Sequence, residues 1–348
     1  MGISKATYQK TRFGNKIMDI NKIIVLGDGG WGTALSILLS KKNFSVTLWS
    51  VSSGYAKELD KKRINRKFLP VIKIPKNIKI TSDINELKDA DLIIISVPSI
   101  YLRSVLKRIN KNDLKNKVII SAVKGIEDKS LLRMSQVITQ ELGKIKLAVL
   151  SGPTIAHEVA NSIPTTAVIA TKNSRLSRIL QNVLTTKRFR IYTNSDIIGV
   201  ELGGSLKNVI AIACGISDGL NFGTNTKAAI LSRGLKEIIR LGKKLGAKEK
   251  TFSGITGLGD LVTTCISAFS RNRQVGFQLG RGLKMHQIMK NMEMVAEGVF
   301  TVKAANALSR KYKIEMPITN QIYNVIYKNK RSINAVNELM TRSKKQEH

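Results

Sequence analysis

The stretch Ile23-Ile24-Val25-Leu26-Gly27-Asp28-Gly29-Gly30-Trp31-Gly32-Thr33-Ala34 decides the fold of this chain. Its four apolar residues predict a buried strand, and Gly27, Gly29 and Gly32 follow with the G-x-G-x-x-G spacing that opens a helix. Gly27 permits the tight turn, Gly29 lets the backbone approach a pyrophosphate, and Gly32 lets the helix pack closely on the sheet. Because the first N–H groups of a helix are unpaired and lie at its positive end, the motif predicts a dinucleotide site rather than a purely structural turn.

Strand and helix patterns alternate through the first half of the chain. Apolar runs predict strands at 22–27, 45–49, 91–97, 117–122, 146–150 and 165–170. Helical patterns lie between them at 31–42, 99–109 and 130–142. This alternation predicts an α/β fold with a mostly parallel, doubly wound, Rossmann-like sheet. Ligands of such sheets bind beyond the carboxyl ends of the strands.

After about Asn194 the pattern becomes helical. Long helical patterns occupy 196–219, 226–245, 297–311 and 318–328. We therefore predict a dinucleotide-binding domain at 22–194 and an all-α C-terminal substrate domain at 195–341, with the substrate in the cleft between them. Residues 1–21 are basic and lack an apolar signal-peptide core, so we interpret them as a disordered extension or as the result of an upstream start.

The composition indicates a cytoplasmic globular protein. The longest apolar stretches, such as Leu92 to Val97, are too short to cross a bilayer, so no integral membrane segment is expected. Cys214 and Cys265 are the only cysteines and form no C-x-x-C pair, and the three histidines have no ligand spacing. We therefore expect no metal site and no disulfide, as suits a reducing compartment.

The formal charge of +34 raises the question of nucleic-acid binding. The basic residues are spread along the whole chain, however, and no zinc-finger, helix-turn-helix or aromatic-interleaved basic motif accompanies them. We therefore predict no nucleic-acid partner, although the positive field would attract anionic small molecules.

Two strands of the predicted sheet end in polar residues. Pro98 ends the strand 91–97, and Ser99 is expected to cap the helix that follows. Lys124 stands beyond the strand 117–122, where ligands bind. Its ammonium could orient a carbonyl or a phosphate there, whereas the alternative is an ordinary surface lysine.

A Gly-Pro turn follows the strand 146–150. In Ser151-Gly152-Pro153-Thr154 the proline begins a new helix, whose free N–H groups favour an anion or a polar substrate group. His157 in that helix is predicted to be a helix-surface residue, since the sequence gives it no partner.

The helix around Glu201 to Ala211 contains two interior glycines, each of which costs about 1 kcal/mol relative to alanine. One face of this helix collects small residues, one amide and one ammonium: Gly203, Gly204, Lys207, Asn208 and Ala211. A substrate could lie in the trough with Lys207 above it. The alternative is close helix packing, with Lys207 reaching to water.

Two further segments carry candidate residues. Asp260 follows the glycine-rich bend Gly254–Gly259, where it either caps a helix or holds a catalytic lysine by a charge-assisted hydrogen bond. Ser270 is expected to cap the next helix, and Arg271 with the free N–H groups there suits a phosphate.

Together these segments resemble the bacterial-type NAD(P)-dependent glycerol-3-phosphate dehydrogenases from about Lys22 to Arg331. The motifs stand in the family's order as GDGGWGTAL, VPS, VKGIE, SGPT, ELGGSLKNVIAI, GLGDL, SRNR and VAEG. The resemblance implies reversible hydride transfer between NAD(P)H and dihydroxyacetone phosphate, which gives sn-glycerol 3-phosphate for glycerophospholipid synthesis. The resemblance is also compatible with a homodimer. The rival interpretation is a related hydroxy-acid dehydrogenase of similar architecture, which would need no phosphate site.

The resemblance assigns roles to individual residues. Lys207 would be the general acid and base, Lys124 would touch both substrate and cofactor, and Asp260 would complete the catalytic group. The implied substrate contacts are Lys124, Gly152, Thr154, Lys207, Asp260, Ser270, Arg271 and Asn272. The motif and the resemblance together imply cofactor contacts at Gly27, Gly29, Gly30, Trp31, Gly32, Lys124, Ala156, Arg271, Val295 and Glu297.

Two departures from the family pattern leave the choice between NAD and NADP open. Gly30 stands where the family often has a hydroxyl residue. Ser50-Val51-Ser52-Ser53, after the second strand, has neither an acid for a ribose 2′-hydroxyl nor the basic residue that the family often carries. Lys57 and Arg63 are the candidates for reaching a 2′-phosphate.

Overall fold

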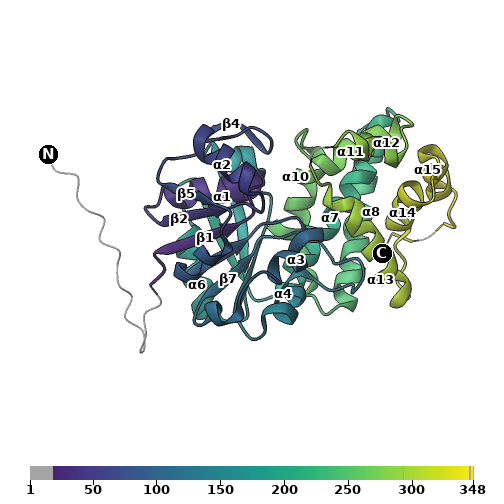
Figure 1. The fold of residues 1–348 in the computed structure, drawn as a ribbon. Coiled ribbons are helices and arrows are strands. Elements are labelled where there is room, and N and C mark those ends of the chain that lie inside the picture. Colours follow the sequence, from purple (N-terminus) through teal and green to yellow (C-terminus); the bar gives the residue numbers. More distant parts are fainter. Residues whose placement is uncertain (1–18, 293, 345, 348) are drawn as a thin grey trace.

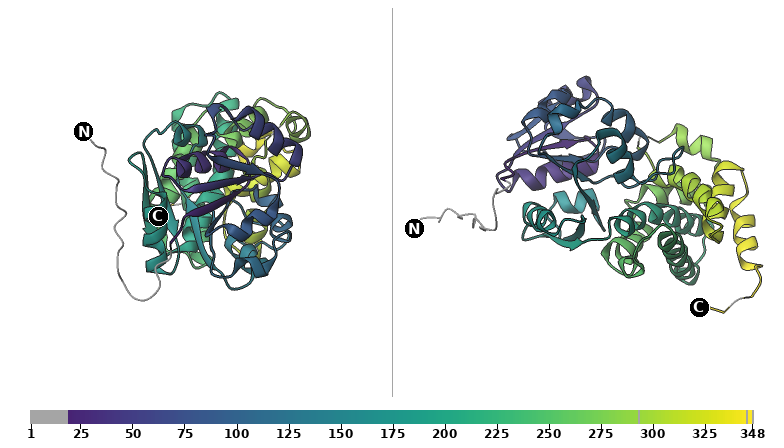
Figure 2. Two further views of the ribbon diagram at one scale, coloured as in Figure 1. Left: turned by 60° about the vertical axis from the view of Figure 1, so that its left-hand side comes forward. Right: turned by 90° about the horizontal axis from the view of Figure 1, so that it is seen from below.

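The computed structural model describes residues 19–292, 294–344 and 346–347, so most of the predicted extension 1–21 lies outside the described residues. The N-terminal half forms an α/β lobe and the C-terminal half a helical lobe beside it (Figure 1). Two further directions show the same two lobes (Figure 2).

Within the described residues, one large sheet has the strand order β10-β9-β8-β7-β6-β1-β2-β5. Its strands are β1 (Lys22–Leu26), β2 (Ser45–Trp49), β5 (Ile78–Thr81), β6 (Leu92–Ile95), β7 (Val118–Ser121), β8 (Lys146–Ser151), β9 (Thr165–Ala170) and β10 (Phe189–Asn194). Neighbouring strands are parallel except for the antiparallel pair β8–β9. The predicted mostly parallel, doubly wound sheet is confirmed, and each predicted strand range overlaps a strand.

Helices cover both faces of this sheet, which explains why its central strands are continuous apolar runs. They are α1 (Gly30–Ser40), α2 (Ser53–Lys62), α3 (Leu102–Leu106), α4 (Met134–Leu142), α5 (Ala156–Ala160) and α6 (Ser174–Leu184). Side chains of α1 and α6 pack on one face and those of α3 and α4 on the other. In β6, Ile94 contributes to the first core and Ile95 to the second.

Four strands were not predicted. The edge strands β5 and β10 alternate apolar with polar residues, because one of their faces meets solvent. A separate short hairpin, β3 (Ile64–Asn65) and β4 (Leu69–Lys73), lies beyond the sheet.

The helical lobe is built around α7 (Ile197–Gly219), which is buried over nearly its whole length. The other helices are α8 (Thr224–Lys244), α9 (Glu249–Phe252), α10 (Asp260–Ile266), α11 (Arg271–Gly280), α12 (Met285–Lys290), α13 (Glu297–Lys311), α14 (Pro317–Tyr327) and α15 (Ser332–Met340). Side chains of α8, α10, α11 and α13 pack around α7 in one core. The predicted all-α character of this half is confirmed.

Glycines bring α7 and α11 into backbone contact. A Cβ at Gly276 would lie 2.1 Å from the carbonyl oxygen of Ile212, and one at Gly215 would lie 2.0 Å from that of Arg273. The two helices therefore approach more closely than any larger residue would allow, and this contact fixes the position of the α11 N-terminus relative to α7.

The expectation that no apolar stretch reaches membrane-spanning length is wrong for α7. This helix alone among the described residues is long and apolar enough to cross a bilayer, with a mean hydropathy of 1.5 over its best window. That window is 89% buried inside the protein, as expected for the core helix of a helical domain.

Candidate active site

Three predicted residues meet where the two lobes join. Lys124 follows β7, Lys207 lies on α7, and Asp260 is the first residue of α10, directly after the π-helical turn Ile255–Gly259. Asp260 accepts hydrogen bonds from both ammonium groups: Oδ2 accepts from Lys124 Nζ at 2.9 Å, and Oδ1 accepts from Lys207 Nζ. The structure thus supports the interpretation that Asp260 holds the lysines; capping of a helix by its side chain is not observed.

Burial dominates the electrostatics of this cluster. Lys207 is only 5% exposed and Asp260 only 1% exposed. Desolvation lowers the pKa of Lys207 to about 7; the carboxylate of Asp260 opposes this shift and the charge of Lys124 adds to it. An amine that titrates near neutral pH both donates and accepts a proton under physiological conditions. The alternative that Lys207 reaches to water is therefore wrong.

The turn after β8 supplies the second hydrogen-bond acceptor of Lys124. Lys124 Nζ donates to the carbonyl oxygen of Gly152 at 2.8 Å, and Thr154 Oγ1 donates to the same oxygen at 3.1 Å. Gly152 has φ +139°, and a Cβ there would lie 3.0 Å from Ala167 Cα. The turn therefore needs glycine, and it places Gly152 and Thr154 next to the lysine.

The glycines of α7 serve packing rather than a substrate trough. A Cβ at Gly203 would lie 2.4 Å from the carbonyl oxygen of Thr256, and one at Gly204 would lie 2.3 Å from Ser151 Oγ. The predicted trough is thus filled by the chain itself. The two glycines therefore let the π-helical turn Ile255–Gly259 and the end of β8 approach α7 closely, next to the turn of the helix that carries Lys207.

The start of α11 contacts α7 next to Lys207, through the hydrogen bond between Asn272 and Asn208. Ser270 caps this helix as predicted, since its side chain accepts from the N–H of Arg273 at 3.3 Å. Asn272 is buried and ties three elements together: its Nδ2 donates to Asn208 Oδ1 at 3.0 Å, and its Oδ1 accepts from the N–H of Gly298 at 2.9 Å. Asn272 is thereby held against α7 and α13.

The VAEG segment joins this region to the α/β lobe. Arg271 is exposed, and its Nη1 donates to the carbonyl oxygen of Val295 at 2.9 Å. Glu297, the first residue of α13, accepts from the backbone N–H of Ser99 at 2.8 Å and from the Ser99 hydroxyl. The prediction that Ser99 caps the following helix is wrong, because its hydroxyl is used in this contact between the lobes. Arg271, Val295 and Glu297 are brought together.

The glycine-rich loop has the geometry that its spacing predicts. Gly27 has φ +119°, and a Cβ at Gly32 would lie 1.9 Å from the Gly27 carbonyl oxygen, so the turn and the close helix packing both require glycine. Gly29, the N-cap residue of α1, faces open space, with nothing within 4 Å of a Cβ built there. The backbone at Gly29 is thus free to approach a pyrophosphate.

The neighbouring positions of the loop are explained by local packing. A Cβ at Gly30 would lie 2.6 Å from the carbonyl oxygen of Phe68 and 3.6 Å from Ala156 Cβ. A residue with a hydroxyl side chain would therefore not fit here. Trp31 is half-buried and packs edge-to-face on Phe189, with ring centroids 6.4 Å apart. Arg63 is engaged locally, where its Nη1 donates to the carbonyl oxygen of Ile78 at 2.7 Å.

Two features were missed or misjudged from the sequence. Buried Glu201 on α7 accepts from the backbone N–H and the hydroxyl of Ser135, each at 2.7 Å, and from Arg133, so it joins the two lobes. His157 is not partnerless: its ring stacks on Phe269, with centroids 5.6 Å apart. The sequence signal for the Glu201 contact was a glutamate inside an apolar helix. No sequence signal marked the stacking of His157 on Phe269.

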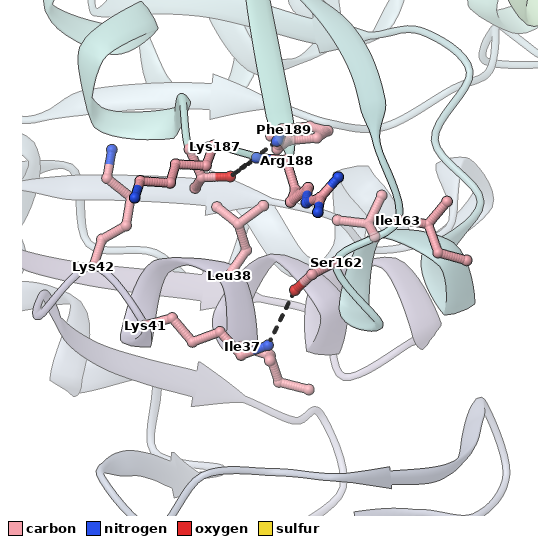
Figure 3. Close-up of a pocket in the computed structure, with 11 residues that line it drawn as sticks. Ile37, Leu38, Lys41, Lys42, Ser162, Ile163, Lys187, Arg188 and Phe189 are labelled. Carbon is pink, nitrogen blue, oxygen red and sulfur yellow. Dashed lines mark hydrogen bonds between the residues drawn. The ribbon is translucent and has the colours of Figure 1, made fainter.

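Two cavities in the described part of the chain lie away from these residues. One, of about 250 Å³, lies between α1, α5 and β10 and has Lys41, Lys187 and Arg188 at its edge (Figure 3). The other, of about 470 Å³, lies beside α13 and α14. Neither is lined by a predicted site residue. Among the described residues, no cluster of histidine, cysteine or acidic residues could hold a metal ion.

Comparison with known proteins assigns the chain to a family. The model of the NAD-dependent glycerol-3-phosphate dehydrogenase N-terminus matches residues 22–177, and that of the C-terminus matches residues 196–337. The chain belongs to this oxidoreductase family. Glycerol-3-phosphate dehydrogenases (NAD(P)+) of Fusobacterium nucleatum and Clostridium tetani are 46% and 44% identical to it, over 94% and 96% of this chain and 98% and 96% of theirs.

A solved structure agrees with this assignment. The crystal structure of the glycerol-3-phosphate dehydrogenase of Coxiella burnetii superimposes with a TM-score of 0.89 at 39% sequence identity. The match covers 93% of this chain and 99% of the other. Both lobes therefore have the family's fold.

Proposed function

We propose that this chain is an NAD(P)-dependent sn-glycerol-3-phosphate dehydrogenase, which interconverts dihydroxyacetone phosphate and sn-glycerol 3-phosphate. The observation that carries the proposal is the buried cluster of Lys207, Asp260 and Lys124 at the junction of the lobes, in a chain of this family. The α/β lobe would bind the cofactor, and the helical lobe would supply the proton.

The glycine-rich loop fits a dinucleotide. The α1 N-terminus has no side-chain cap, Gly29 faces open space, and the helix dipole favours a pyrophosphate there. When bound, the nicotinamide cofactor supplies or accepts the hydride. We propose as its contacts Gly27, Gly29, Gly30, Trp31, Gly32, Lys124, Ala156, Arg271, Val295 and Glu297.

Lys207 would move the proton. In ketone reduction its ammonium donates to the substrate oxygen as negative charge develops there, and in alcohol oxidation its neutral amine takes that proton back. A pKa of about 7 suits both directions. Asp260 fixes the position of Nζ by a charge-assisted hydrogen bond, and Lys124 adds a second positive charge beside the oxygen.

The substrate phosphate would lie at the start of α11. Arg271 offers a planar set of donors, and the helix N-terminus adds its positive dipole end. Ser270 and Asn272 flank Arg271 in the sequence, while Lys124 and Thr154 both donate to the carbonyl oxygen of Gly152. These residues, with Lys124, Lys207 and Asp260, form the proposed substrate site.

We further propose that the functional units are the cofactor domain 22–194 and the substrate domain 195–341, since β10 ends at Asn194 and α7 begins at Ile197. The two cysteines are free and buried, which supports a cytoplasmic enzyme. Its product would enter glycerophospholipid synthesis. A homodimer remains a prediction, and light scattering coupled to size-exclusion chromatography measures it.

The test is the loss of absorbance of NADH, and separately of NADPH, when dihydroxyacetone phosphate is added to the purified protein. We expect turnover with at least one cofactor, and a much higher KM for dihydroxyacetone, which lacks the phosphate. Absence of turnover with both cofactors would refute the proposed substrate. A 2-keto acid as the preferred substrate would favour the hydroxy-acid dehydrogenase interpretation.

A further inference from the structure

The end of β2 lacks the residue that usually distinguishes NAD from NADP. In Rossmann domains an acid placed about 20 residues after the glycine motif binds the ribose 2′-hydroxyl, or a nearby arginine accepts the 2′-phosphate. Here β2 ends at Trp49, and Ser50 to Ser53 contain no ionisable side chain. Val51, in the middle of this segment, is 61% exposed.

A carboxylate reaches this place from the neighbouring strand instead. Asp28 follows Gly27 at the end of β1, and Leu26 of β1 is paired with Trp49 of β2. Asp28 Oδ2 accepts a hydrogen bond from Ser50 Oγ at 2.5 Å. The carboxylate therefore lies beside the first residue after β2, where the ribose-binding acid of a dinucleotide domain ordinarily stands.

The loop that carries Asp28 is held in position. The side-chain amide of Asn65 donates to the Asp28 carbonyl oxygen at 2.7 Å and to Thr33 Oγ1 at 2.8 Å. Asn65 is completely buried and is itself fixed by the hydroxyl of Tyr55, which donates to Asn65 Oδ1 at 2.7 Å. Since these bonds hold the backbone of residue 28, its carboxylate is presented without a further rearrangement.

We propose that Asp28 is the specificity-determining residue that selects NAD over NADP. Its carboxylate would accept hydrogen bonds from the adenosine ribose hydroxyls, whereas the 2′-phosphate of NADP would meet a like charge at the same place. This inference rests on the proposed function, because it assumes that the glycine-rich loop holds the dinucleotide.

The nearby cations do not replace Asp28. Arg63 is engaged by Asp60 and by the carbonyl oxygen of Ile78. Lys67 is exposed, and its charge acts on Asp28 over a distance while its Nζ lies 5.3 Å from the centroid of the Phe68 ring. Lys67 is therefore the residue that a rival, NADP-selective arrangement would use.

Cofactor binding measured by isothermal titration calorimetry tests the inference without turnover. We expect the unmodified protein to bind NADH at least about tenfold more tightly than NADPH, which corresponds to ~1.4 kcal/mol. Asp28→Asn keeps the shape and the contact with Ser50 but removes the charge, so it should reduce this ratio about tenfold, mainly through tighter NADPH binding. Asp28→Ser is the second variant, with thermal melting as the check on folding for both.

The matched control is Glu58→Gln, which removes an exposed carboxylate that is paired with Lys62 on α2. It should leave the NADH to NADPH ratio unchanged. The inference is overturned if neither Asp28 variant changes the ratio, if neither cofactor binds, or if NADPH binds more tightly and Lys67→Ala abolishes that preference. Selective NADH binding without turnover of dihydroxyacetone phosphate would refute the proposed substrate but support the role of Asp28.

Discussion

Replacing Lys207 with alanine tests the proton transfer on which the proposed mechanism depends. The substitution removes the ammonium that donates to the substrate oxygen, while Asp260 keeps its hydrogen bond from Lys124. Loss of a positioned general acid costs about 10²- to 10⁴-fold in rate. We therefore expect kcat for ketone reduction to fall by about 10²-fold or more, with the Kd for the reduced cofactor unchanged.

The pKa of Lys207 gives a second, independent magnitude. Burial lowers it to about 7, so about half of the molecules carry the ammonium at pH 7 and roughly a tenth carry it at pH 8. For ketone reduction, kcat should fall by about tenfold per pH unit above 7. For alcohol oxidation, which needs the neutral amine, kcat should instead rise with pH up to the same value and then level off.

Steady-state absorbance at 340 nm, measured from pH 6 to pH 9 in both directions, provides both readouts. Lys303→Ala is the matched control, because Lys303 is an exposed lysine of the same lobe, paired with Asp128. It should leave kcat and its pH profile unchanged. Lys207 is not the proton donor if Lys207→Ala turns over near the normal rate. The same conclusion follows if the two directions of the unmodified enzyme do not show opposite dependences on pH. Lys124 would then be tested next.

Three other substitutions test the site and its supports. Arg271→Ala should raise the KM for dihydroxyacetone phosphate by about 10²-fold and leave dihydroxyacetone reduction nearly unchanged; equal effects on both would remove Arg271 from the phosphate site. Gly32→Ala places a Cβ 1.9 Å from a carbonyl oxygen and should lower the melting temperature by several degrees, whereas Gly29→Ala, in open space, should keep the melting temperature and weaken cofactor binding in calorimetry. Glu201→Ala leaves buried donors without an acceptor and should lower the free energy of unfolding by about 3 kcal/mol in urea denaturation; a loss below about 1 kcal/mol would contradict this.

The central part of the fold could be predicted because its strands are buried on both faces. A continuous apolar run such as Leu92 to Ile95, bounded by turn residues, is typical of a central strand in a parallel sheet. The edge strands β5 and β10 alternate buried apolar residues with more exposed ones and each contain one basic residue, Lys79 and Arg190, and this mixed pattern is shared with exposed turns and short helices. Apolar runs therefore identified the centre of the sheet and missed its edges.

The candidate site was predictable where one segment carries its own signal. Lys124 and Asp260 stand at the ends of recognisable motifs, although the contact between them spans 136 residues and depends on the packing of α10 against α7. The contact between Ser99 and Glu297 spans 198 residues, and a serine after a strand looks like a helix cap from its neighbours alone. Gly203 and Gly204 showed that something approaches the helix closely, but not that the chain itself fills the space.

The apolar character of α7 also has a consequence for synthesis of the chain. The four helices that cover it, α8, α10, α11 and α13, all follow it in the sequence, and α13 ends only at Lys311. During translation, α7 leaves the ribosome nearly 100 residues before its cover is complete, as a segment apolar enough for a bilayer. Chains that stop before Glu297 should therefore aggregate or associate with membranes. Premature termination in this region is thus expected to give an aggregation-prone fragment rather than a soluble, inactive one.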